Sequence, residues 1–129
     1  MGLFSKFFNG NSGTKEEKQL PWLDVTELSQ LKAIKEKSGT KTQIIFKHSI
    51  RCGISRMVMN QFVEDFNFEN GEVDLYYVDV INHRDVSNAV ANIFNVVHES
   101  PQLLVVKNGV VVAHESHGSI NSMDLKAYI

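Results

Sequence analysis

The chain has 129 residues, of which 43% are hydrophobic and 22% charged, which suits one globular domain and not two. Its net charge of −2, without a basic stripe, argues against a nucleic-acid surface. The single cysteine, Cys52, excludes an internal disulfide and a dithiol Cys-x-x-Cys mechanism. No apolar run approaches the ~20 residues that cross a bilayer, so we expect a cytoplasmic protein without a transmembrane segment.

Residues 1–20 have the composition of a linker, so we expect a flexible N-terminal tail followed by one domain over residues 21–129. The tail also carries Phe4, Phe7 and Phe8. These aromatic residues are interpreted either as a weak membrane- or partner-binding segment or as part of a tail without a role of its own.

The ordered domain is predicted to begin near Pro21 with a helix. Asp24 is the candidate N-cap, with Glu27 as its reciprocal partner, and apolar residues at helical spacing follow until Gly39. Residues 42–48 are largely β-branched and aromatic, which predicts a buried strand.

An apolar residue recurs every fourth position over residues 54–66, which predicts a helix. The stripe consists of Ile54, Val58, Phe62 and Phe66. Residues 73–80 are again β-branched and aromatic and predict a second strand. Strand, helix and strand at this spacing form a βαβ unit, which implies a parallel pair of strands.

Another helical pattern starts at Asp85 and ends around Val97. Pro101 stands directly before an apolar run, so it lies at the start of a strand, at an edge or in a tight turn, and a cis peptide bond is possible there. The dipeptide Asn108-Gly109 between two β-branched runs specifies a type I′ hairpin. A final helix is expected from about Asn121. It should bury Met123, Leu125 and Tyr128 or Ile129.

These elements define an α/β fold in which a βαβ unit is followed by a ββα hairpin unit, with a mixed sheet and helices on both faces. Cys52 lies between the strand at 42–48 and the helix at 54–66, at or just before a helix N-terminus. Unpaired backbone N–H groups and the helix dipole favour a thiolate there, and Lys47 and Arg51 add positive charge. A reactive thiol is therefore predicted, the alternative being an inert buried cysteine.

A reactive cysteine after the first parallel strand and a Ser-Pro pair before a hairpin strand resemble the thioredoxin fold, over residues 21–129. In that superfamily the bond before the proline is cis and the preceding backbone pairs with a bound thiol or peptide, which implies this role for Ser100 and Pro101. The run from Phe46 to Ser55 resembles, more particularly, the YtxJ-like monothiol bacilliredoxins. Gly53 stands where members of that family often carry proline, and is assigned to the thiol-binding residues.

This resemblance implies a monothiol thiol–disulfide oxidoreductase in which Cys52 removes bacillithiol, or a similar small thiol, from S-thiolated client proteins. The small thiol is then a co-substrate, and neither a tightly bound cofactor nor a metal is expected. Lys47 and Arg51 are candidates for holding its carboxylates. Ser55 replaces a resolving cysteine, and its hydroxyl is expected to hydrogen-bond Cys52 or to cap the helix. His48 is a candidate for proton transfer.

Other functions stay open. Residues 52–55 also resemble the Cys-Gly-Phe-Ser signature of monothiol glutaredoxins, which implies an iron–sulfur cluster carrier. A metal site that joins His114 and His117 to Cys52 is disfavoured, because residues three apart on a strand point to opposite faces. A tyrosine-phosphatase or arsenate-reductase loop would need an arginine where Val58 stands. A thioredoxin-like binding module would not depend on Cys52 at all.

Overall fold

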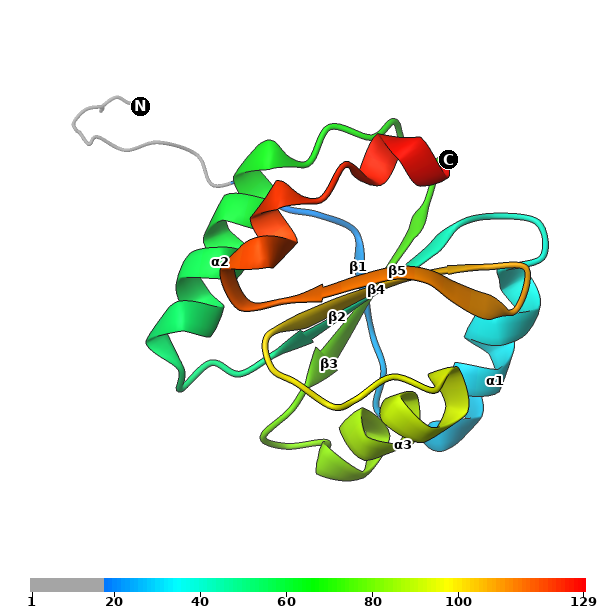
Figure 1. Ribbon diagram of the computed structural model, residues 1–129, viewed down its shortest axis with the longest axis horizontal. Helices are drawn as coiled ribbons and strands as arrows, with labels where there is room; N and C mark the ends of the chain where they lie inside the picture. Colours follow the sequence, from blue (N-terminus) through cyan, green and yellow to red (C-terminus); the bar gives the residue numbers. More distant parts are fainter. Residues whose placement is uncertain (1–17) are drawn as a thin grey trace.

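The computed structural model describes residues 18–129 (Figure 1). Residues 1–17, with Phe4, Phe7 and Phe8, lie outside the described residues. In chain order the elements are β1 (Trp22–Asp24), α1 (Leu28–Lys37), β2 (Gln43–His48), α2 (Gly53–Asp65), β3 (Asp74–Asp79), α3 (Arg84–Phe94), β4 (Gln102–Lys107), β5 (Val110–Ser116) and two 3-10 helices, η1 (His117–Ser122) and η2 (Leu125–Tyr128).

The strands form one five-stranded mixed sheet in the order β1-β3-β2-β4-β5. β1 and β2 run parallel to β3, whereas β4 runs antiparallel to both β2 and β5. The predicted parallel pair of the βαβ unit and the predicted hairpin are therefore both confirmed. Asn108 and Gly109 have φ values of 51° and 82°, the positive φ at both turn residues that a type I′ turn requires.

Each face of the sheet carries its own apolar core. On one face the sheet packs against α1 and α3, and on the other against α2 and η1. Figure 1 shows α1 and α3 together on one side and α2 with the C-terminal turns on the other. Side chains alternate along β2, so Ile45 contributes to the α1/α3 core and Phe46 to the α2 core. The prediction of helices on both faces is confirmed.

The beginning of the domain differs from the prediction. Residues Trp22–Asp24 form the short strand β1, and α1 starts only at Leu28, with Glu27 as its N-cap. The side chain of Gln30 accepts hydrogen bonds from the backbone N–H groups of Thr26 and Glu27, at 2.8 and 3.0 Å. The cap therefore lies three residues beyond the expected Asp24. A strand of three residues is too short to show a period of its own in the sequence.

Two predictions from apolar residues were wrong in part: the buried stripe along α2 and the C-terminal helix. In α2, Val58 and Phe62 are buried, but Ile54 is 56% exposed and Phe66 is the half-buried C-cap. At the C-terminus the chain forms the 3-10 turns η1 and η2 instead of an α-helix, because Met123 between them has an extended backbone. In this part of the chain Ile120 is buried against α2, whereas Met123, Leu125 and Tyr128 are half-buried and Ile129 is exposed.

Candidate functional site

Two loops meet at the edge of the sheet where β2 ends. β2 and β4 are antiparallel neighbours, with Lys47 opposite Gln102, so the loop that follows β2 and the segment that precedes β4 emerge together. The first loop carries Cys52 and the second ends in Ser100 and Pro101. The peptide bond between Ser100 and Pro101 is cis, as the resemblance implied. The sheet register thus brings the two sequence motifs to the same edge.

Cys52 is the N-cap of α2. Its backbone is extended, its N–H donates to the carbonyl of Ser49 at 3.2 Å, and its carbonyl accepts the first helical hydrogen bond, from Arg56 at 3.0 Å. The first turn of α2 holds no acidic residue, and the cysteine is free and half-buried. The predicted place of Cys52 is confirmed: a partly accessible thiol at a helix N-terminus, where backbone N–H groups lack helical partners.

Arg56 lies across this loop, and the sequence patterns did not single it out. Its Nη1 donates to the carbonyl of Ile50 at 2.9 Å. A Cβ atom placed on Gly53 would stand 3.8 Å from Nη2 of the same side chain. The guanidinium therefore spans the turn from Ile50 to Gly53, which contains Cys52. Its spacing of four residues from Cys52, on one face of a helix, was the available signal.

The other exposed residues around Cys52 are a cation, a glycine and three large apolar side chains. Arg51 is exposed, and its side chain forms no hydrogen bond or ion pair with residues 18–129. Gly53 is also exposed. Ile50, Ile54 and Met57 are 53%, 56% and 72% exposed, so three large apolar side chains stand around the N-terminus of α2. An apolar surface beside a thiol is suited to contact another protein.

Ser55 supports the site from beneath and does not face a ligand. It is completely buried, and its Oγ accepts a hydrogen bond from the N–H of Ser49 at 3.0 Å. The same Oγ forms a hydrogen bond with Nδ1 of His48, at 2.7 Å. The expected roles as a Cys52 partner or a direct thiol contact are corrected, because Ser55 is completely buried and its hydroxyl bonds Ser49 and His48 instead. Ser55 joins the end of β2 to the first turn of α2.

His48 is buried beneath the same turn. Its ring packs edge-on against Tyr77, with 5.8 Å between ring centroids. Burial lowers the pKa of His48, Asp79 opposes this shift and Arg56 adds to it. His48 is therefore neutral at pH 7. Its hydrogen bond to Ser55, and the bond from Ser49 to Ser55, connect it to the loop that carries Cys52.

Lys47 is not the exposed cation that the sequence suggested. It is 0% exposed and points to the α3 side of the sheet, where its Nζ lies 3.1 Å from Nδ1 of His98. Burial lowers the pKa of Lys47 to about 8. An amino group enclosed in this way cannot reach a carboxylate bound at Cys52, so the assignment of Lys47 to the thiol-binding residues is corrected. A buried lysine in a central strand has no sequence signal that separates it from a surface one.

The predicted residues of the second loop lie at its end. Pro101 is buried and Ser100 half-buried, and the Oγ of Ser100 is buried without a hydrogen-bond partner within residues 18–129.

No cluster of three potential metal ligands occurs within residues 18–129. Within the same range no helix is long and apolar enough to cross a membrane.

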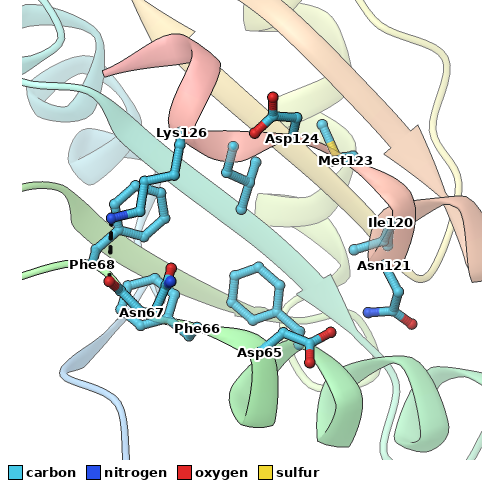
Figure 2. Close-up of a pocket in the computed structure, with 11 residues that line it drawn as sticks. Asp65, Phe66, Asn67, Phe68, Ile120, Asn121, Met123, Asp124 and Lys126 are labelled. Atoms are coloured by element: carbon cyan, nitrogen blue, oxygen red, sulfur yellow. Dashed lines mark hydrogen bonds between the residues drawn. The ribbon is translucent and has the colours of Figure 1, made fainter.

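A separate cavity of about 190 Å³ opens at the other end of α2 (Figure 2). Phe66 and Phe68 line it from the end of α2, and Met123 and Leu125 line it from the C-terminal turns. Lys126 lies 4.7 Å above the ring of Phe68. No residue of the Cys52 loop contributes to this cavity, which is therefore distinct from the thiol site.

Solved structures share the fold of this chain. A candidate oxidoreductase with a thioredoxin fold superposes with a TM-score of 0.69 and 32% identity, covering 82% of this chain and 91% of the other. Thioredoxin O2 from Arabidopsis thaliana gives 0.62 at 21% identity, covering 83% and 90%. Thioredoxin Mala s 13 from Malassezia sympodialis gives 0.61 at 21%, covering 81% and 84%. Fold and site thus define a thioredoxin-fold protein with a thiol redox role.

The sequence also identifies the family within the thioredoxin-fold proteins. Residues 23–125 match the family of the monothiol bacilliredoxin BrxC. The chain belongs to this family, as the resemblance of residues 46–55 had indicated.

Proposed function

We propose that the chain is a monothiol thiol–disulfide oxidoreductase that removes bacillithiol, or a similar small thiol, from protein mixed disulfides through Cys52. The observation that carries this proposal is the position of Cys52: it is the half-buried N-cap of α2, in the turn that the Arg56 guanidinium spans from Ile50 to Gly53. A thiolate is favoured where helix N–H groups and a cation converge.

The exchange needs only one cysteine. The Cys52 thiolate attacks the small-thiol sulfur of the mixed disulfide, a new S–S bond forms, and the client cysteine leaves as a thiolate that takes up a proton. A second small-thiol molecule, as thiolate, then attacks the small-thiol sulfur joined to Cys52. This step releases Cys52 and the disulfide of the small thiol, which acts as co-substrate and not as a bound cofactor.

Recognition of the small thiol is assigned to Arg51 and Arg56. Bacillithiol-type thiols carry carboxylates, and a guanidinium binds a carboxylate by paired, charge-assisted hydrogen bonds. Arg56 uses Nη1 for the carbonyl of Ile50, which leaves Nη2 on the side of Gly53. The proposed anion position is therefore between Nη2 of Arg56 and Gly53, the residue that follows Cys52.

The client protein is assigned to the apolar side chains of Ile50, Ile54 and Met57, and to the backbone of Ser100, which precedes the cis bond. Client recognition then has two parts, apolar contact and backbone pairing. A free thiol of this kind persists in a reducing compartment, so a cytoplasmic site of action is part of the proposal.

The decisive experiment follows the mass of the intact, reduced protein during exposure to bacillithiol disulfide and, in parallel, to cystamine, which has no carboxylate. We expect one bacillithiol adduct per chain, and none in Cys52→Ser. Arg56→Gln should slow the reaction with bacillithiol disulfide roughly three- to fivefold more than that with cystamine, the range for an exposed charge pair.

Lys32→Gln is the matched control, because Lys32 is an exposed cation of α1 on the opposite face of the sheet. It should leave both rates unchanged. Absence of any adduct on Cys52 at neutral pH would refute the proposal. Visible absorbance after anaerobic reconstitution with iron and sulfide would instead favour an iron–sulfur cluster carrier.

A further inference from the structure

A group of buried polar side chains lies beneath the segment that leads to Pro101. This segment, residues 95–101, joins α3 to β4 and belongs to no helix or strand. The buried group comes from three different elements, β2, α3 and β4. Its members are Lys47, Ser87 and Gln102, which are 0%, 0% and 1% exposed.

All three side chains bind the segment. Nζ of Lys47 and Oγ of Ser87 lie 3.1 and 3.3 Å from the same atom, Nδ1 of His98. Nε2 of Gln102 donates to the carbonyl of Val97 at 2.9 Å. Because the segment lacks regular secondary structure, these side-chain contacts fix its path from the core side.

The place of Lys47 in the sheet connects this anchor to the thiol site. Lys47 and His48 are consecutive residues at the end of β2, so their side chains point to opposite faces. His48 contacts Ser55 below the Cys52 loop, whereas Lys47 contacts His98 below the segment that carries the cis bond. One strand end thus supports both loops of the site.

We propose that Lys47 is a positioning residue for disulfide exchange at Cys52: its buried amino group holds His98, and so fixes the backbone of residues 98–101 that receives the client protein. The inference rests on the proposed function for its role in exchange. It adds a residue that does not touch the substrate and acts through another loop.

The contact depends on a neutral His98, because only a neutral ring has an unprotonated Nδ1 that accepts from Lys47. Burial, then Lys47, then Arg84 lower the pKa of His98 below its ordinary value of 6.5, and Glu99 opposes them. Ser87 and Gln102, the other groups that bind the segment, carry no charge. At pH 7 the contact is therefore intact. In more acidic solution a proton on Nδ1 would face the Lys47 ammonium across 3.1 Å, and the two would separate.

The first test measures the anchor itself, without substrate. Backbone ¹⁵N relaxation of the full chain gives order parameters for residues 98–100, which should be about 0.85 when the segment is held and below about 0.6 when it is free. Lys47→Met and His98→Phe should both lower these values at pH 7. The exposed Lys37, exchanged in Lys37→Met, is the matched control and should change nothing. Lowering the pH through the depressed pKa of His98 should free the segment in the wild type.

The second test separates positioning from other roles. In both variants KM for a protein mixed disulfide should rise about tenfold with little change in kcat, while iodoacetamide alkylation of Cys52 keeps its rate. The double variant should be no worse than either single one, because both remove the same contact. His98→Phe serves alone if Lys47→Met does not fold.

Three results would overturn the inference. An equal loss of alkylation and turnover would show that Lys47 acts on the thiol. Unchanged order parameters would show that it does not hold the segment. A mobile segment with unchanged KM would show that the anchor is only structural. Absence of turnover in the wild type would instead refute the proposed function, while the relaxation data still decide whether Lys47 holds the segment.

Discussion

At the scale of single residues, the hydroxyl of Ser55 joins two parts of the site. It accepts from the N–H of Ser49 and pairs with Nδ1 of His48, all in a buried position. Ser55→Ala would leave that N–H and that ring nitrogen without partners, at a cost of about 1–3 kcal/mol in the free energy of unfolding. Urea denaturation at pH 7 measures this loss.

The control for this prediction is Ser29→Ala, because Ser29 is an exposed serine in α1. It should stay within about 0.5 kcal/mol of the wild type. A Ser55→Ala variant as stable as the Ser29→Ala variant would mean that water replaces the hydroxyl, and the prediction would be wrong.

The positions of single residues were predictable from the sequence only where they depend on local order. Cys52 and Pro101 stand out because each follows or precedes a strand pattern, and neither assignment needs knowledge of the tertiary structure. Lys47 and Ser55 were misjudged because their surroundings come from other elements: His98 lies 51 residues from Lys47, and His48 reaches Ser55 across the turn. Spacing along one strand or helix carries no information about such partners.

At the scale of elements, the β4–β5 hairpin is the connection that its own sequence determines most directly. Gly109 has a φ of 82°, and a Cβ atom there would meet only Cε of Lys35, at an ordinary 3.9 Å. Gly109→Ala therefore introduces backbone strain without a clash, and should lower the free energy of unfolding by roughly 1–2 kcal/mol. Thermal unfolding followed by circular dichroism detects this change.

Gly118→Ala provides the comparison, because a Cβ atom at Gly118 meets nothing within 4 Å and its φ lies outside the left-handed region. This variant should differ from the wild type by less than about 0.5 kcal/mol. Equal losses at the two glycines would contradict the role given to the turn.

The sequence could predict those elements whose own residues carry a strong local signal. β2, β3, β4 and the hairpin have strong local signals, and their predicted bounds agree with the structure within about a residue or two. β1 is stabilised by its pairing with β3, and the C-terminal turns by the burial of Ile120 against α2. Both depend on tertiary contacts that outweigh local propensity, so the sequence did not predict β1 and predicted one helix where two 3-10 helices form.

At the scale of the whole molecule, the division into two cores explains why Ile54 and Met57 are exposed. α2 turns Val58 and Phe62 towards the sheet, and Ile54 and Met57 are left uncovered by residues 18–129. The apolar stripe expected along the helix therefore splits: its inner part stabilises the fold, and its outer part is left beside Cys52. Exposed apolar area next to a free thiol is most simply explained by a protein partner.

This explanation predicts a difference between protein and small substrates. The double variant Ile54→Gln and Met57→Gln keeps the charge and removes apolar area, so KM for a protein mixed disulfide should rise about tenfold, equivalent to about 1.4 kcal/mol of lost burial. The reaction with cystamine should keep its rate, because that molecule is too small to cover the surface. Val110→Gln, at an exposed valine of β5, should affect neither reaction. An equal loss with both substrates would show that the two side chains support the thiol itself, and the exposed surface would then have no part in client recognition.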